Sequence, residues 1–265
     1  MDEIDEITVR NLPEASALLD RARGLAMVDA IRETRVEIAE WGGWGGYTLS
    51  APAAGHPCRV LTTHEQPQGL DVHFHPEGVF ILGWDRDCGA LLPRAEVERV
   101  VAEQVPAAFQ DCPLSPAHER HWCQMTEDEV LFNFACWRPD GAERWQQTEL
   151  DERLVNEHVM RVGEEPQSLL LYDLIKPAPE MLCLGSETVR GMFPDDLQDG
   201  EEIPWKETGL TSAEAIRHVL ALRPLTDQVV QTLNPFLSAA DLAKDIEAIG
   251  YPQAAGGTDE MGGCG

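Results

Sequence analysis

Three short strand-like segments follow one another with very little chain between them, and this spacing restricts the fold more than any other feature of the sequence. Residues Arg59–Thr63, Leu70–His75 and Val79–Asp85 are rich in branched and aromatic side chains, and Gly and Pro residues separate them. Parallel neighbouring strands need a crossover of a dozen or more residues, which these connections cannot supply. We therefore expect a small, mainly antiparallel sheet.

A hairpin is predicted further along the chain. Residues Glu129–Arg138 alternate between apolar and polar side chains, and Pro139–Ala142 has the composition of a turn. Residues Glu143–Leu150 would return along the first strand.

Helices are predicted before and beside these strands. The first 40 residues have apolar side chains at helical spacing, with Pro13 at an early helical position and Gly24 expected to bend or split the helix. Residues Pro93–Val105 return to helical spacing, with four valines on one side.

The C-terminal part is predicted to be mainly helical. Helices are expected over Thr211–Leu222, Leu225–Leu233 and Ser238–Ile249, and capping boxes begin the first (Thr211 to Glu214) and the last (Ser238 to Asp241). The fold class is therefore α+β: an antiparallel sheet with flanking helices, followed by a helical C-terminal region. We expect a mixed domain over residues 1–150, a mainly helical region over 151–253 and a flexible Gly-rich tail over 254–265.

The charge of the chain restricts its partners. There are 47 acidic and 20 basic residues, which gives a formal net charge of −27. Such a surface repels phosphate backbones and anionic membranes and attracts cations and basic proteins. We expect no nucleic-acid or membrane partner, and solubility alone is the alternative explanation of the charge.

The sequence predicts a cytoplasmic protein. The N-terminus is acidic where a secretory signal would be basic, and no apolar run approaches the roughly 20 residues that span a bilayer. Seven cysteines are present, an odd number without a Cys-x-x-Cys pair, so reduced thiols are expected.

One candidate metal site lies in the second predicted strand. His73 and His75 are two residues apart and would project from the same face, which suits a divalent metal such as zinc or iron. Glu77 would join them if the strand continued past Pro76. The pattern resembles the metal motif of the cupins, although Glu77 follows the second histidine more closely than in that family. The alternative is a histidine-containing strand that leads into a proline turn.

A second group of candidate metal ligands is local in sequence. Cys112, His118, His121 and Cys123 lie within twelve residues, and four such ligands can hold zinc. Two prolines stiffen the segment, and the alternative is a surface loop.

The chain resembles a family of actinobacterial proteins to which no activity is assigned. The resemblance covers about residues 75–252 and is carried by several blocks: Phe80–Asp85, Ala135–Arg138, His218–Val230, Leu233–Pro235 and Ile249–Pro252. It implies a bacterial cytosolic protein, and no site residues follow from it.

Three functions are compatible with this sequence. The first is a binding protein, for example an inhibitor or immunity-type protein for a basic partner, in which the charge steers association. Its expected contact residues are aromatic anchors and a nearby acidic stretch: Trp41, Trp44, Asp195, Asp196, Asp199, Glu201, Glu202 and Trp205. The second is a metal-dependent enzyme that uses His73, His75 and Glu77. The third is a scaffold or assembly component that displays the tail with Cys264.

Overall fold

A single antiparallel sheet dominates the structure, a computed structural model. The structure describes residues 8–32, 46–52, 58–63, 68–85, 90–112, 129–132, 134–149, 166–179, 182 and 207–253. Six strands follow the order β1-β2-β3-β4-β7-β8, and every neighbouring pair is antiparallel. Their bounds are β1 Tyr47–Leu49, β2 Arg59–Thr63, β3 Gln68–His75, β4 Gly78–Asp85, β7 Phe134–Pro139 and β8 Gln146–Gln147. The predicted α+β class and its antiparallel sheet are confirmed.

The predicted hairpin is partly wrong. The expected strand over Glu129–Arg138 is two strands that serve different sheets. β6 (Glu129–Phe132) pairs with β5 (Ala90–Pro93) in a separate two-stranded sheet, whereas β7 pairs with β4 and β8. Both halves share one alternating pattern, so the sequence does not reveal the change of partner. The returning strand, β8, is also much shorter than expected.

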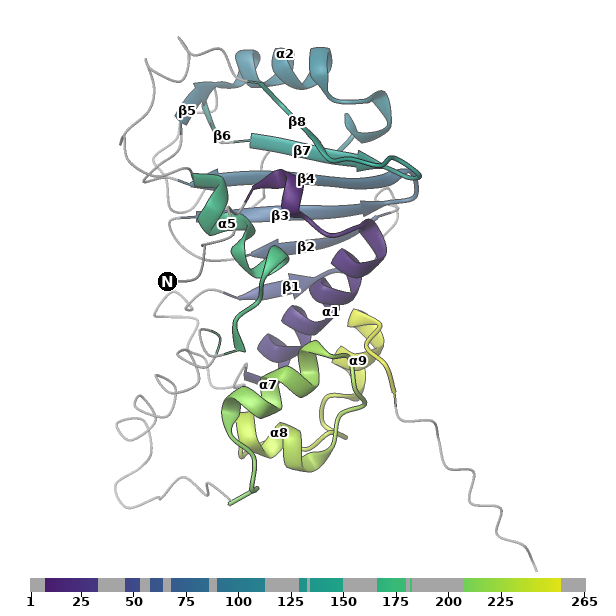
Figure 1. Ribbon diagram of the computed structural model, residues 1–265, viewed down its shortest axis with the longest axis vertical. Helices are drawn as coiled ribbons and strands as arrows, with labels where there is room; N and C mark the ends of the chain where they lie inside the picture. The colour runs from purple at the N-terminus through teal and green to yellow at the C-terminus, as the bar shows by residue number, and fades with distance from the viewer. Residues whose placement is uncertain are drawn as a thin grey trace, which may run out of the picture.

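The two faces of the main sheet pack against different helices. Successive side chains of a strand point to opposite faces. Val72 and Ile81 belong to a large core with α1 (Ala15–Arg32) and α5 (Pro166–Ile175). Phe80 and Trp137 belong to a second, smaller core that includes α2 (Arg94–Gln104) and the short helix η3 (Ala107–Phe109). Figure 1 shows α2 at the β8 end of the sheet and α1 running along it toward the opposite end.

The glycine in α1 packs against another helix and does not break its own. α1 continues through Gly24, which is buried, so the predicted split is wrong. A Cβ at this position would lie 3.1 Å from the Cα of Leu220, in α7 (Ser212–Leu220). Gly24 therefore allows two helix backbones to approach closely.

The C-terminal helices form a cap at the β1 end of the molecule. α7, α8 (Asp227–Leu233) and α9 (Ala243–Ile249) each contact α1 (Figure 1). The capping box of α7 is confirmed, because the Thr211 side chain accepts a hydrogen bond from the Glu214 N–H and the Glu214 carboxylate accepts one from the Thr211 N–H. Through these contacts with α1, the buried apolar side chains of the three helices join the large core.

The predicted start of the last helix is wrong. Ser238 and Asp241 do form hydrogen bonds, but within a turn, and α9 begins only at Ala243 after an N-cap at Leu242 that supplies no side-chain hydrogen bond. None of the described helices combines the length and apolar character needed to cross a membrane.

Candidate functional site

Polar side chains gather on the α2-facing side of β3. Asp71, His73 and His75 alternate with core residues, so all three project from one face of the strand. On β4 they lie opposite Leu82, Phe80 and Gly78. Asp71 and His73 are 4% and 2% exposed, which is unusual for polar groups in the middle of a sheet. This row is the strongest candidate site in the described part of the chain.

His73 contacts a cysteine from the neighbouring strand. The Sγ of Cys58, which directly precedes β2, lies 3.9 Å from the Nδ1 of His73. The centroid of the imidazole ring is 5.9 Å from that of Phe80. Burial raises the pKa of the Cys58 thiol, and a backbone hydrogen bond lowers it to a smaller extent. A thiol and an imidazole therefore meet in a nearly dry environment.

His75 has a structural role at the end of the same strand. Its Nδ1 accepts a hydrogen bond from the backbone N–H of Glu77 at 3.1 Å. Its ring meets Phe109 edge-on, with centroids 5.8 Å apart. The hydrogen bond occupies Nδ1, so only Nε2 of this ring is open to another partner.

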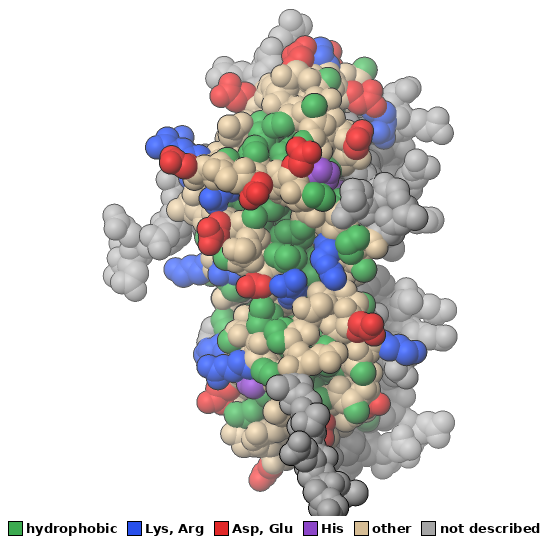
Figure 2. All heavy atoms as spheres, turned by 90° about the vertical axis from the view of Figure 1, so that its right-hand side faces the viewer, with side chains coloured by type: hydrophobic (Ala, Val, Ile, Leu, Met, Phe, Trp, Pro, Cys, Tyr) green, Lys and Arg blue, Asp and Glu red, His purple; other side chains and the backbone are tan. Residues whose placement is uncertain are grey.

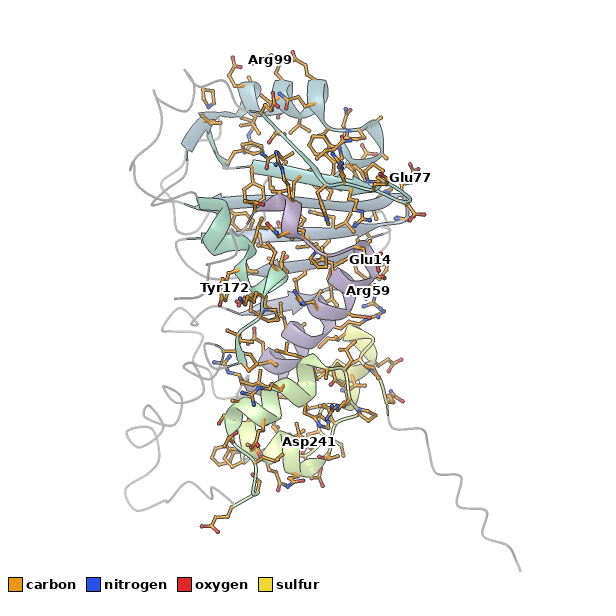
Figure 3. All side chains as sticks on the ribbon, in the orientation of Figure 1. Glu14, Arg59, Glu77, Arg99, Tyr172 and Asp241 are labelled. Atoms are coloured by element: carbon orange, nitrogen blue, oxygen red, sulfur yellow. The ribbon has the colours of Figure 1, made fainter. Side chains whose placement is uncertain are left out.

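The position of Glu77 agrees with the alternative interpretation of this segment, a histidine-containing strand that leads into a proline turn. β3 ends at His75, and Pro76 and Glu77 form the two-residue connection to β4. Gly78 has a φ of 137°, and a Cβ there would overlap the Arg138 carbonyl, so glycine is required. The Glu77 side chain is exposed at the tip of this hairpin (Figure 3). The strand does not continue past Pro76, which was the condition for Glu77 to join the histidines.

Over the residues that the structure describes, no group of three or more His, Cys, Asp or Glu side chains is arranged to hold a metal ion. The three-residue metal site at His73, His75 and Glu77 stays a prediction, as does the metal-dependent enzyme that would use it.

Asp71 is the carboxyl group of this row, and its pKa is shifted. Burial raises its pKa to about 6, and a hydrogen bond from the Thr62 side chain opposes this shift. Thr62 lies directly opposite on β2. The Oδ1 atom of Asp71 is buried and has no hydrogen-bond partner among the described residues. Such groups are uncommon in folded proteins and mark candidate functional positions.

The sequence did not single out Cys58 or Asp71. Asp71 has a signal, since it continues the two-residue spacing of His73 and His75. Cys58 has none, because its contact with His73 depends on the register between β2 and β3.

The second group of predicted metal ligands is described only at Cys112. This thiol is buried beside Phe109 in the smaller core. Burial raises its pKa to about 12, with smaller contributions from Cys58 and Asp111. His118, His121 and Cys123 lie outside the described residues. So do all the predicted partner-binding residues: Trp41, Trp44, Asp195, Asp196, Asp199, Glu201, Glu202 and Trp205.

The acidic residues are unevenly distributed along the chain. The described residues hold 21 acids and 13 bases. The other 26 acids are accompanied by only 7 bases. On the face shown in Figure 2, acidic and basic side chains are interspersed among apolar ones. Most of the net negative charge therefore belongs to segments outside the described frame.

Comparisons of this chain with protein-family models, with curated proteins and with solved structures found no match, so the resemblance to an actinobacterial family stays a prediction.

Proposed function

We propose that this chain is a cytoplasmic binding protein that takes a basic protein as its partner, in the manner of an inhibitor or immunity protein. The observation that carries the proposal is the uneven charge. The described residues hold 21 acids against 13 bases, whereas the remaining segments hold 26 acids against 7 bases.

One dense acidic stretch lies near an aromatic residue. Asp195, Asp196, Asp199, Glu201 and Glu202 precede Trp205 within eleven residues. Acidic side chains accelerate the encounter with a basic surface, and a desolvated aromatic side chain supplies affinity after docking. The proposed partner is therefore a protein with a basic surface, such as a nuclease, whose own site is built for phosphate groups.

The test compares two variants with the same loss of charge. In the site variant, the five acids of residues 195–202 are replaced by their amides. In the control variant, five exposed acids of the described frame are replaced in the same way: Glu98, Asp140, Glu143, Glu207 and Glu247. The wild type and both variants are used to capture proteins from a lysate of the native host at low and high salt.

We expect the wild type and the control to retain a basic protein that high salt releases, and the site variant to lose it. Stopped-flow association with the purified partner should then slow steeply with ionic strength for the wild type. Two results contradict the proposal: the wild type retains no salt-sensitive basic protein, or both variants lose binding equally.

A further inference from the structure

The two edge strands of the six-stranded sheet, β1 and β8, each have only one neighbouring strand in the described part of the chain. Main-chain N–H and C=O groups on the outer side of an edge strand can pair with a strand from another molecule. Because main-chain polar groups need hydrogen-bond partners, the groups at each edge require a partner other than a strand of this sheet.

At β8 this partner is a side chain of α2. The N–H of Thr148 donates to the carbonyl of Ala135 on β7 at 2.8 Å, so the main chain of Thr148 faces inward. Alternate residues of an antiparallel strand face opposite sides, so the main chain of Glu149 faces outward. The Glu149 N–H donates to Oε1 of Gln104 at 2.8 Å, and Nε2 of Gln104 donates to the Glu149 carbonyl at 2.9 Å. The Gln104 carboxamide therefore makes both hydrogen bonds that a neighbouring strand would make here.

At β1 the partner is a side chain of α1. The N–H of Ser50 donates to the carbonyl of Val60 on β2 at 2.9 Å, so Ser50 faces inward and, by alternation, Tyr47 faces outward. The Tyr47 N–H donates to Oδ2 of Asp29. A carboxylate accepts hydrogen bonds and repels other acceptors, so it also opposes the approach of a carbonyl oxygen from an added strand.

We propose that Gln104 and Asp29 hold the two edges of the sheet closed to strand addition by a second copy of the chain. A second copy is the relevant partner, because every copy carries the same two edges. At β8 the side chains of Gln146 and Gln147 are exposed and uncharged, so they would not themselves prevent pairing. The proposal concerns the described sheet and is independent of the acidic stretch at residues 195–202.

The experiment opens the β8 edge in the full chain with Gln104→Ala and measures self-association by analytical ultracentrifugation over a range of concentrations. We expect self-association at least about tenfold tighter than that of the wild type. Gln110→Ala is the control, because among the described residues its side chain donates only to the carbonyls of Ala102 and Val105, around the end of α2. A Gln104→Ala chain that associates no more tightly than this control would overturn the proposal.

A second substitution separates strand pairing from general loss of structure. Gln147 lies in the middle of the exposed edge, and a lysine on an edge strand opposes pairing because its charge would lose water. We expect Gln147→Lys to return Gln104→Ala to the association of the wild type. Association that persists in the double variant refutes the proposal, as does a wild type that already associates and that Gln147→Lys alone dissociates.

Two substitutions of one residue test the β1 edge. Asp29→Ala and Asp29→Asn both remove the charge that pairs with Arg32, but only asparagine keeps an acceptor for the Tyr47 N–H. We expect Asp29→Ala to associate more tightly than the wild type and Asp29→Asn to behave as the wild type does. Equal association of the two variants would contradict the role of Asp29.

Discussion

The guanidinium group of Arg59 donates a hydrogen bond of 2.8 Å to the carbonyl oxygen of Ala248, 189 residues later in the chain. It donates a second one, of 3.3 Å, to the carbonyl oxygen of Ile249. These carbonyls belong to the last turn of α9, which ends at Gly250 in the left-handed conformation. Arg59 thus places a positive charge at a helix C-terminus and joins β2 to the C-terminal helices (Figure 3).

Replacing Arg59 should loosen the C-terminal cap. We expect Arg59→Ala to lower the free energy of unfolding by about 1–2 kcal/mol, because the last carbonyls of α9 lose both a charge and a hydrogen-bond donor. Hydrogen exchange should show the loss first in residues Ala243–Ile249. Arg99→Ala is the control, since Arg99 pairs only with Glu96 and Glu103 on the exposed side of α2 among described residues. Equal effects of the two substitutions would contradict the assigned role of Arg59.

Gly24 provides a test of the contact between α1 and α7. We expect Gly24→Val to destabilise the protein by about 1–3 kcal/mol, because the new side chain would overlap the backbone at Leu220. Ala17→Val, at an exposed position of the same helix, should cost only about 0.5 kcal/mol or less. Urea unfolding of the two variants distinguishes these outcomes. A Gly24→Val protein as stable as the control would show that α7 does not lie tightly on α1.

The features that were predicted correctly from the sequence depend on residues that lie close together along the chain. β2, β3 and β4 were found within two residues of their ends, since each pairs with the next strand and short connections force antiparallel pairing. The capping box at Thr211 was found for the same reason, because its two residues are three positions apart.

Features that depend on distant contacts were missed. β5 and β6 pair across about forty residues, and no local pattern separates β6 from β7. A glycine within a helical pattern suggests a helix break, but Gly24 instead allows the backbone of α7 at Leu220 to approach α1 closely. At the candidate site, the shared face of His73 and His75 was predictable, whereas the approach of Cys58 depends on the register of two strands.

Two similar sequence motifs should differ in their effect on stability. Thr211→Ala should cost about 1 kcal/mol, because the Thr211 hydroxyl accepts a hydrogen bond from the Glu214 N–H, which has no partner within the helix. Ser238→Ala should cost about 0.5 kcal/mol or less, since among the described residues the Ser238 hydroxyl bonds only the exposed Asp241 carboxylate, outside any helix. Thermal unfolding of both variants measures the difference, and a larger loss at Ser238 would refute it.

The hydrogen bond from the Tyr47 hydroxyl to Asp173 should make one substitution depend on pH. Burial raises the pKa of Asp173, and this hydrogen bond opposes the shift. Because the native state then binds the proton more strongly than the unfolded state, the contribution of Asp173 to stability is greatest at low pH. It is lost as the pH rises from about 3.8 through the higher folded-state pKa.

Tyr47→Phe removes a donor that matters most when Asp173 is ionised. We expect a cost of about 1.5–3 kcal/mol at pH 7.5, where the partner is a charged carboxylate, and about 0.5–1.5 kcal/mol at pH 3.5, where it is neutral. Urea unfolding at the two pH values measures both costs. Tyr172→Phe, on α5 beside Asp173 (Figure 3), is the control. Within the described residues, the Tyr172 hydroxyl makes no hydrogen bond. A cost for Tyr47→Phe that is equal at both pH values would mean that Asp173 does not ionise in the folded protein over this range.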